Sequence, residues 1–393
     1  MQMKTLPIFL AFLLMGVADA MGPMSDAVKR NFAISDTMAT LMSFFVFIAF
    51  AAFSVPGGLL AARVGKKNVL LLGLLLNSIA VAIPAFSSPT YPVLLVCIFA
   101  LGVGTTLLQV AGNPIMRDVS AKGDYSRNLA LAQGIKGVGS TTMTILATAG
   151  ISLAFLPVLQ NMGWRGVFPI FFVLMALAFI FVFSLKVQET KADVPPSIVS
   201  SLSLLGIPTF ALAVLGIFFY VGAEVCMSRF LLPTLKDFGI APSTAAWAGP
   251  VAFLGSLTFG RIVAGSVKVS ARIFFRISAL LGLLGAILLM LGNKELAIVG
   301  VVIGGLGFAN IWPMLFSITV EEKPECANEL SGLMCMAISG GAIVPLLMAK
   351  MRDGGMTSMS FVVPGACFAY LLLLSLKGAK NPREPMSIHQ ILQ

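Results

Sequence analysis

The sequence predicts an all-α protein that crosses a membrane many times. Hydrophobic residues make up 58% of its 393 residues and charged residues only 11%, whereas soluble domains carry about 25% charged residues. The apolar residues gather in stretches of about 20, the length that a helix needs to cross a hydrocarbon core of about 30 Å. Because a bilayer offers no water to backbone groups, each stretch must satisfy its own hydrogen bonds and is expected to be a helix.

Twelve such stretches follow one another along the chain, several of them as unbroken runs of Leu, Ile, Val and Ala. The predicted spans are 6–24, 38–62, 68–88, 91–114, 127–153, 164–186, 206–232, 242–265, 271–291, 295–318, 329–351 and 357–376. An even number of spans places both termini on one side of the membrane. Most of the 26 lysines and arginines fall on that side, which the positive-inside rule identifies as cytoplasmic. The net charge of +10 therefore reflects topology and does not indicate nucleic-acid binding.

The longest polar stretch, 186–197, lies between the sixth and seventh spans and divides the chain into two sets of six. Two such sets with a central linker are typical of transporters built from two repeats. We therefore expect 12 transmembrane helices in two six-helix bundles. The predicted divisions are an N-terminal bundle at 1–187, a cytoplasmic linker at 188–205, a C-terminal bundle at 206–377 and a cytoplasmic tail at 378–393.

Each half carries a short, basic, glycine-bearing turn after its second span. In the first half the turn contains Gly58, Arg63, Gly65 and Lys66, and in the second half Arg261 stands at the equivalent place. Repetition at equivalent places is stronger evidence than either turn alone, so we expect both turns to act as gating loops. The alternative is that they are two ordinary loops that follow the positive-inside rule.

The first of these turns resembles the signature loop of the major facilitator superfamily, G-x-x-x-D-R-x-G-R-K, although Ala62 stands where the pattern usually has aspartate. Five further segments are similar to motifs of the fucose and glucose/galactose permease group and occur in the order of that group. They are 108–114, 128–133, 220–224, 312–317 and 340–345. The resemblance covers nearly the whole chain. It implies the major facilitator fold, and a secondary transporter that imports a monosaccharide or a sugar derivative by alternating access.

Four ionisable residues are predicted to lie inside spans: Asp19, Lys136, Glu224 and Arg229. Because an ionisable group in a bilayer is energetically costly, we expect each one to face a cavity or a partner. The glycines and proline of segment 16–23 allow a broken helix around Asp19. A carboxylate in a partly dry cavity can bind a proton on one side and release it on the other, and the resemblance implies that role for Asp19. We predict proton coupling at Asp19 and Glu224.

Several amides are predicted to bind the sugar. Gln109 and Asn113 are four residues apart, and Gln133 and Lys136 are three apart, so each pair shares a helix face. Amides both donate and accept hydrogen bonds, which suits a ligand rich in hydroxyl groups. Gln109 stands where the fucose permease has a glutamate, and a glutamine cannot titrate. The alternative is that these side chains join neighbouring helices.

Two cations depart from the pattern of the resembled group. Lys136 stands where the group usually has asparagine, and Arg229 where its members are usually uncharged. Both would suit an anionic sugar acid, such as a hexuronate or a sialic-acid-like molecule, because arginine binds carboxylates through paired hydrogen bonds. Alternatively, Lys136 pairs with Asp19, or Arg229 with Glu224, and the pair gates the cavity. Both interpretations stay open.

An aromatic face is predicted beside a helix break in the tenth span. Trp312 precedes Pro313, and Asn310 lies just before them. A sugar ring can pack on the indole, and the break frees carbonyls that could accept its hydroxyl groups. We assign Asn310 and Trp312 to sugar binding, together with Glu224. The alternative for Trp312 is a bulky residue without a binding role.

The chain lacks the residue patterns of an enzyme. Its five cysteines have no metal-ligand spacing, and its one histidine, His389, lies in the polar tail. A Walker loop, a Rossmann fingerprint and an H-E-x-x-H helix are all missing from the sequence. We therefore expect no catalytic residue, cofactor or metal. Energy must come from an ion gradient or from the gradient of the substrate.

The expected partners are a small sugar, a coupling proton and membrane lipid, without nucleic acid. We expect a monomer in a bacterial inner membrane with both termini cytoplasmic. The second alternative is a membrane sensor of the same fold, which would bind its ligand without transporting it.

Overall fold

The computed structural model describes residues 6–19, 21–148, 162–189 and 196–377, which fold almost entirely into helices and contain no β-strand. The earlier helices are α1 (Leu6–Asp19), α2 (Met21–Phe32), α3 (Asp36–Val64), α4 (Lys66–Phe86), α5 (Tyr91–Val119), α6 (Tyr125–Thr148), α8 (Phe168–Ser184) and α9 (Ile198–Ser203). The later ones are α10 (Pro208–Asp237), α11 (Pro242–Ala246), α12 (Ala252–Ser266), α13 (Ala271–Met290), α14 (Lys294–Ala309), α15 (Ile311–Glu322), α16 (Ala327–Met336), α17 (Gly340–Asp353) and α18 (Val362–Lys377).

Ten helical segments of the described chain are long and apolar enough to cross a membrane, and α1 is apolar but shorter. These segments confirm the predicted all-α, multi-pass class. Helix α6 is not among the ten, because polar residues such as Gln133, Lys136 and Ser140 interrupt its apolar sequence. The number of twelve spans therefore stays a prediction, and residues 149–153 of the fifth predicted span lie outside the described residues.

Several predicted spans are two helices in series. Asn310 separates α14 from α15, and a 3₁₀ turn at Ala337–Ser339 separates α16 from α17. Pro313 explains the first break, because proline has no N–H to donate to the carbonyl of Ala309, four residues earlier. The predicted broken helix in the tenth span is therefore present, with one backbone carbonyl released from the helix ladder.

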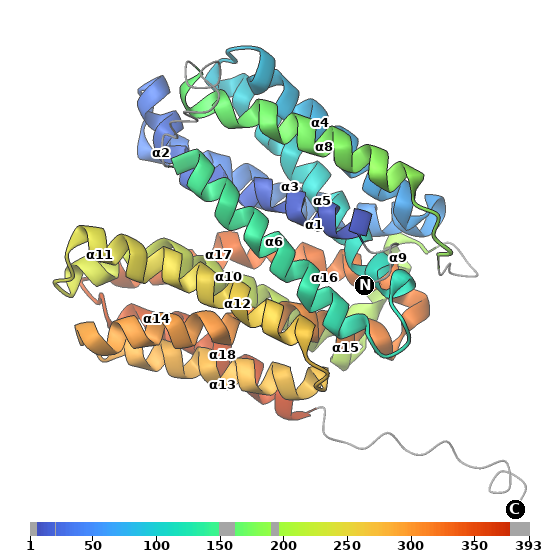
Figure 1. Cartoon of the computed structure of the whole chain (residues 1–393). Coiled ribbons are helices and arrows are strands. Elements are labelled where there is room, and N and C mark those ends of the chain that lie inside the picture. The colour runs from blue at the N-terminus through green and yellow to red at the C-terminus, as the bar shows by residue number, and fades with distance from the viewer. Residues whose placement is uncertain (1–5, 20, 149–161, 190–195, 378–393) are drawn as a thin grey trace, which may run out of the picture.

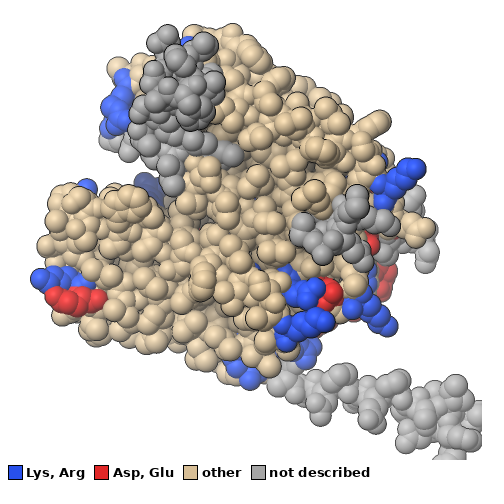
Figure 2. All heavy atoms as spheres, viewed as in Figure 1, with Lys and Arg blue, Asp and Glu red and all other residues tan. Residues whose placement is uncertain are grey.

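The helices form two groups that lie side by side (Figure 1). We call α1–α8 the first bundle and α10–α18 the second bundle. They pack against each other along two seams, α6 against α12 and α3 against α16, and α9 contacts both α3 and α16. The bundles separate towards the end where α2 and α11 lie, and the surface is hollowed there (Figure 2). The molecule is therefore open at one end and closed at the other.

Close backbone contacts hold the closed end together. A Cβ atom added to Gly58 of α3 would lie 2.5 Å from the backbone oxygen of Asn328. A Cβ atom added to Gly265 of α12 would lie 2.7 Å from Cβ of Leu131 in α6. Both distances are far shorter than ordinary carbon contacts, so each seam requires glycine.

We call the closed end the basic end, because lysines and arginines gather there (Figure 2). Its α3–α4 connection is tightly fixed. Gly65 has a φ of 95°, which favours glycine. The ammonium group of Lys66 pairs with Asp118 of α5, and Lys66 is only 1% exposed. The carboxylate of Glu189 accepts hydrogen bonds from the backbone N–H groups of Lys66 and Lys67. An acidic group at a helix N-terminus is favourable, so the turn is a rigid corner.

The predicted gating loops therefore need correction. Gly58 and Arg63 lie inside α3, and Lys66 opens α4, so only Gly65 lies between two helices. The basic turn assigned to Arg261 overlaps the predicted span 242–265, and the structure decides between the two: α12 continues to Ser266, so Arg261 lies inside the helix and its assignment to a turn is wrong. A gating role for these residues stays a prediction.

Candidate functional site

An ion pair joins α1 and α6 inside the first bundle. Nζ of Lys136 lies 3.4 Å from Oδ2 of Asp19, and the hydroxyl of Ser140 donates to the same oxygen at 2.6 Å. Gly16 and Gly139 let the two helices approach, because a Cβ atom at either position would meet the facing backbone within 2.5 Å. The side chain of Asp19 is 44% exposed and that of Lys136 is 16% exposed. The predicted Asp19–Lys136 pair is therefore formed and is not sealed within the packed helices.

Buried amides lie beside this pair on α5 and α6. Nε2 of Gln133 donates to Oδ1 of Asn113 at 3.3 Å, and Nδ2 of Asn113 contacts Sγ of Cys335 in the second bundle at 3.9 Å. Gln109 lies one turn before Asn113 and is 4% exposed. Because Gln133 and Lys136 share a helix face, the structure brings four predicted binding residues, 109, 113, 133 and 136, into one region of the first bundle.

A second polar cluster surrounds Arg261 of α12. Its Nη2 donates to the hydroxyl of Tyr220 at 3.0 Å and lies 3.9 Å from Oε1 of Glu224. Its Nε donates at 3.0 Å to the carbonyl of Ala309, the group released from the helix at Pro313. Its Nη1 donates at 3.4 Å to the carbonyl of Gln133 in the first bundle. Arg261 is only 6% exposed, so it is an interior residue that links the two bundles.

The sequence interpretation missed this position of Arg261. The arginine follows Gly260 and precedes a basic segment, which resembles a loop. The signal that could have placed it is the apolar run at 262–264, which continues the span for another turn.

The break between α14 and α15 contributes two further predicted residues. Nδ2 of Asn310 donates to the carbonyl of Gly260 at 3.3 Å, and the indole of Trp312 stacks on Phe316 with ring centroids 5.9 Å apart. In the described part of the chain, Oδ1 of Asn310 and Nε1 of Trp312 are buried and have no hydrogen-bond partner. A buried polar atom without a partner is unfavourable. The break therefore leaves one acceptor and one donor unused.

Arg229 is not part of these clusters. It follows Glu224 by five residues, which turns it about 140° around an α-helix. Its guanidinium lies over the ring of Phe230, 5.7 Å from the ring centroid, and the residue is exposed. Glu224 lies against Arg261, so the alternative pair of Glu224 with Arg229 is not formed.

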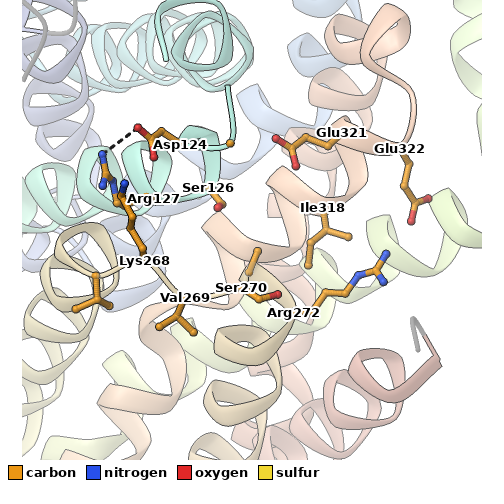
Figure 3. Close-up of a pocket in the computed structure, with 13 residues that line it drawn as sticks. Asp124, Ser126, Arg127, Lys268, Val269, Ser270, Arg272, Ile318, Glu321 and Glu322 are labelled. Carbon is orange, nitrogen blue, oxygen red and sulfur yellow. Dashed lines mark hydrogen bonds and ion pairs between the residues drawn. The ribbon is translucent and has the colours of Figure 1, made fainter. Parts of the chain in front are cut away.

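A cavity of about 630 Å³ lies at the basic end, between the α5–α6 connection, the α12–α13 connection and α15 (Figure 3). Both signs of charge line it, including Asp124, Arg127, Lys268, Arg272 and Glu321. Arg127 pairs with Asp124 at 3.2 Å. The predicted sugar-binding residues do not line this cavity, so we treat it as part of the contact between the bundles. Within the described ranges, no group of three or more His, Cys, Asp or Glu residues could hold a metal ion.

Known proteins agree with this architecture. The sequence profile of the Major Facilitator Superfamily matches residues 8–345. A glucose/galactose transporter of Brucella abortus is 29% identical over 373 residues, which cover 90% of this chain and 88% of that protein. The L-fucose-proton symporter of Escherichia coli is 22% identical over 384 residues, which cover 88% of this chain and 86% of that one.

The same fold is found among solved structures. The crystal structure of the transporter FucP in the outward conformation superposes with a TM-score of 0.84 at 18% identity, covering 97% of this chain and 99% of that one. The matching relatives are transporters and not enzymes. The sequence profile and the fold together show that the chain belongs to the Major Facilitator Superfamily.

Proposed function

We propose that this chain imports a neutral monosaccharide together with a proton, by alternating access of one central site. The observation that carries the proposal is the partly exposed Asp19–Lys136 pair beside the amides of Asn113 and Gln133. It places a group that can bind a proton next to groups that can bind hydroxyls. Relatives named as a glucose/galactose transporter and as an L-fucose-proton symporter support the same choice of cargo and ion.

Asp19 carries the proton in this proposal. Its protonation removes the charge that holds Lys136, while Ser140 can keep its hydrogen bond to the carboxyl group. Lys136 then has donors free for sugar hydroxyls. Proton binding therefore prepares the site for the sugar, which makes the two events cooperative.

The second bundle supplies the other face of the sugar site. The unused acceptor of Asn310 and donor of Trp312 can bind hydroxyls once small shifts open them to the ligand. The indole offers an apolar surface for the C–H groups of a pyranose ring. Hydrogen bonds from one bundle and packing from the other would close the two bundles around the sugar.

The orientation follows from the charges. The start of α1, the end of α18 and the basic connections lie at the basic end, so the positive-inside rule favours a cytoplasmic location for it. The open end then faces outward, and a bacterial inner membrane is the proposed location. We further propose that the bundles extend over 1–187 and 206–377, that 188–205 links them and includes α9, and that the protein is a monomer.

Replacing Asp19 by asparagine tests the proposal. In proteoliposomes with an inward proton gradient, Asp19→Asn should lose uphill uptake of radiolabelled D-galactose or L-fucose, because asparagine cannot titrate. It should keep counterflow exchange between two pools of sugar, since exchange needs no net proton movement. If Asp19→Asn still concentrates sugar, the assignment of Asp19 is wrong. A wild-type protein that binds sugar without flux would instead be a sensor.

One observation favours a second candidate, an anionic sugar acid as cargo. Lys136 is a cation beside the amides of Asn113 and Gln133, where it could bind a carboxylate of the cargo once Asp19 is protonated, whereas Arg229 lies apart on α10. Lys136→Asn separates the two candidates. Uptake of a hexuronate should collapse in this variant if the cargo is acidic, whereas uptake of a neutral sugar should survive if the cargo is neutral.

A further inference from the structure

Arg261 makes contacts that depend on whether the basic end is closed. Two of its hydrogen bonds, to Ala309 and Tyr220, stay within the second bundle. The third, from Nη1 to the carbonyl of Gln133, crosses to α6 of the first bundle. The seam that it crosses is the α6–α12 contact, which glycines such as Gly265 hold closed.

Glu224 is the acceptor next to this guanidinium. Its Oε1 lies 3.9 Å from Nη2, which is an ion pair without a close hydrogen bond. The charged and titratable groups that act on Glu224 are Arg261, Tyr220, Lys136 and Asp19. Helix α17 also packs against α10. Its Arg352 binds Thr234 and Asp237, which follow Glu224 by ten residues or more along α10.

Opening the basic end must separate α6 from α12. Nη1 of Arg261 then loses the carbonyl of Gln133, and a buried guanidinium with an unpaired N–H is unfavourable. Within the second bundle the carboxylate of Glu224 is the adjacent acceptor. A charge-assisted hydrogen bond to it is stronger than one to a neutral carbonyl. The ionised form of Glu224 therefore gains a close hydrogen bond in the opened state, where the closed state has only the 3.9 Å ion pair.

We propose that Arg261 is a positioning residue that couples release of a proton from Glu224 to the opening of the basic end. While that end is closed, Arg261 holds Gln133, and Glu224 can keep a proton. When the end opens, Arg261 turns to Glu224 and favours its ionised form. Conversely, a protonated Glu224 favours the closed end. The inference rests on the proposed alternating access. It assigns to Arg261 a role in opening the basic end, which the Asp19–Lys136 pair of the first bundle does not have.

The test measures opening of the basic end directly, without sugar. Spin labels on Lys122→Cys and Lys268→Cys lie on opposite sides of the seam, and both positions are exposed. The background carries Cys326→Ser, because Cys326 is half-buried, and Asp19→Asn, so that Asp19 does not titrate. The distance between the labels is recorded in nanodiscs by pulsed electron spin resonance from pH 5 to pH 9.

In this background the open-to-closed ratio should rise with pH, by up to about tenfold per pH unit, because one proton is linked to the change. Arg261→Gln should reduce this dependence to below about twofold per pH unit, since the amide brings no charge to Glu224. Arg261→Lys keeps the charge and should restore part of the dependence. Glu224→Gln should keep the basic end closed at every pH.

Arg276→Gln is the matched control, because Arg276 is exposed on α13 and takes no part in either cluster. It should show the pH response of the background. The inference is overturned if Arg261→Gln or Glu224→Gln keeps the pH dependence of the background. It is also overturned if the background itself shows no pH dependence. Failure of sugar import alone would not, because the distances are measured without cargo. The two proposals can therefore fail separately.

Discussion

Asp19 with Lys136 in the first bundle, and Glu224 with Arg261 in the second, are ion pairs in different surroundings. The side chain of Asp19 is 44% exposed, and its partner comes from a neighbouring helix of the same bundle. The side chain of Glu224 is 25% exposed and that of Arg261 is 7% exposed, and Arg261 is also held by three oxygen atoms besides Glu224. An exposed pair can exchange protons and ligands with water. Arg261 is buried between the bundles and can change its contacts only when the helices around it move. We therefore assign chemistry to the first pair and conformational coupling to the second.

The remaining polar groups differ in the same way. In the first bundle, Asn113 and Gln133 already bind each other, so their amides are oriented before a ligand arrives. In the second bundle, Asn310 and Trp312 leave an acceptor and a donor unused. One bundle offers buried amides that are already oriented by each other, and the other offers groups that gain partners only on closure. This asymmetry would make substrate binding itself favour movement of the second bundle.

The largest expected effect comes from removing the buried cation. Arg261→Leu should destabilise the protein at pH 9 by about 3–5 kcal/mol, because an ionised Glu224 would then remain in the interior without its partner. Thermal unfolding in detergent measures the loss. Lys136→Leu should cost less, because Asp19 is 44% exposed and its carboxylate can be solvated without the lysine. If both variants lose the same stability, the two pairs do not differ as described.

A double variant controls for a general packing defect at this position. Arg261→Leu combined with Glu224→Leu should recover much of the lost stability, since an apolar pair can replace a buried ion pair. A double variant that is less stable than Arg261→Leu alone would point to packing instead.

An intermediate effect is expected at the seam. Gly58→Ala would place Cβ 2.5 Å from the backbone oxygen of Asn328. Overpacking of this kind usually destabilises the packed state, here the closed basic end, by about 1–3 kcal/mol. The basic end should therefore open more often, which the spin labels at 122 and 268 would report as a longer distance. Gly255→Ala is the matched control, because Gly255 has open space around its Cβ position. Equal distances in both variants would show that the seam tolerates the methyl group.

The smallest expected effect concerns sugar affinity. Gln133→Ala removes the donor to Asn113 and one candidate contact to the sugar, and a neutral hydrogen bond contributes about 1 kcal/mol. The apparent affinity for D-galactose should fall by about fivefold, while uphill transport remains coupled to protons. Counterflow at a series of sugar concentrations gives the affinity. Loss of coupling in this variant would place the amides in the proton pathway.

The class of fold could be predicted because its physical cause is local. Lipid favours apolar runs of one length, and every such run is visible in the sequence. The pair of Asp19 and Lys136 could be named as an alternative for a similar reason, because two opposite charges inside spans need a partner. The sequence does not decide which of the four ionisable residues form pairs. In the structure Lys136 pairs with Asp19 and Arg261 with Glu224, so Arg229 is not the partner of Glu224.

The partners of Arg261 could not be predicted, because they depend on contacts between distant segments. Its partners include Gln133, which lies 128 residues away in the sequence, and a carbonyl at Ala309 that only the break at Pro313 releases. Charge and flanking glycine favoured a loop, whereas the tertiary hydrogen bonds allow the residue to lie inside a helix. The unused atoms of Asn310 and Trp312 also depend on packing and carry no local signal.

The polarity of α6 has a consequence for how the protein is made. A lysine near the middle of a span opposes insertion into a bilayer by about 2.5–3.5 kcal/mol on translocon scales, and α6 also carries Gln133 and Ser140. The partners that offset these groups, Asn113 and Asp19, are on helices synthesised earlier. We expect α6 to enter the membrane together with α1 and α5 and not alone. Residues that equip the protein for transport would then also make its biogenesis depend on the order of synthesis.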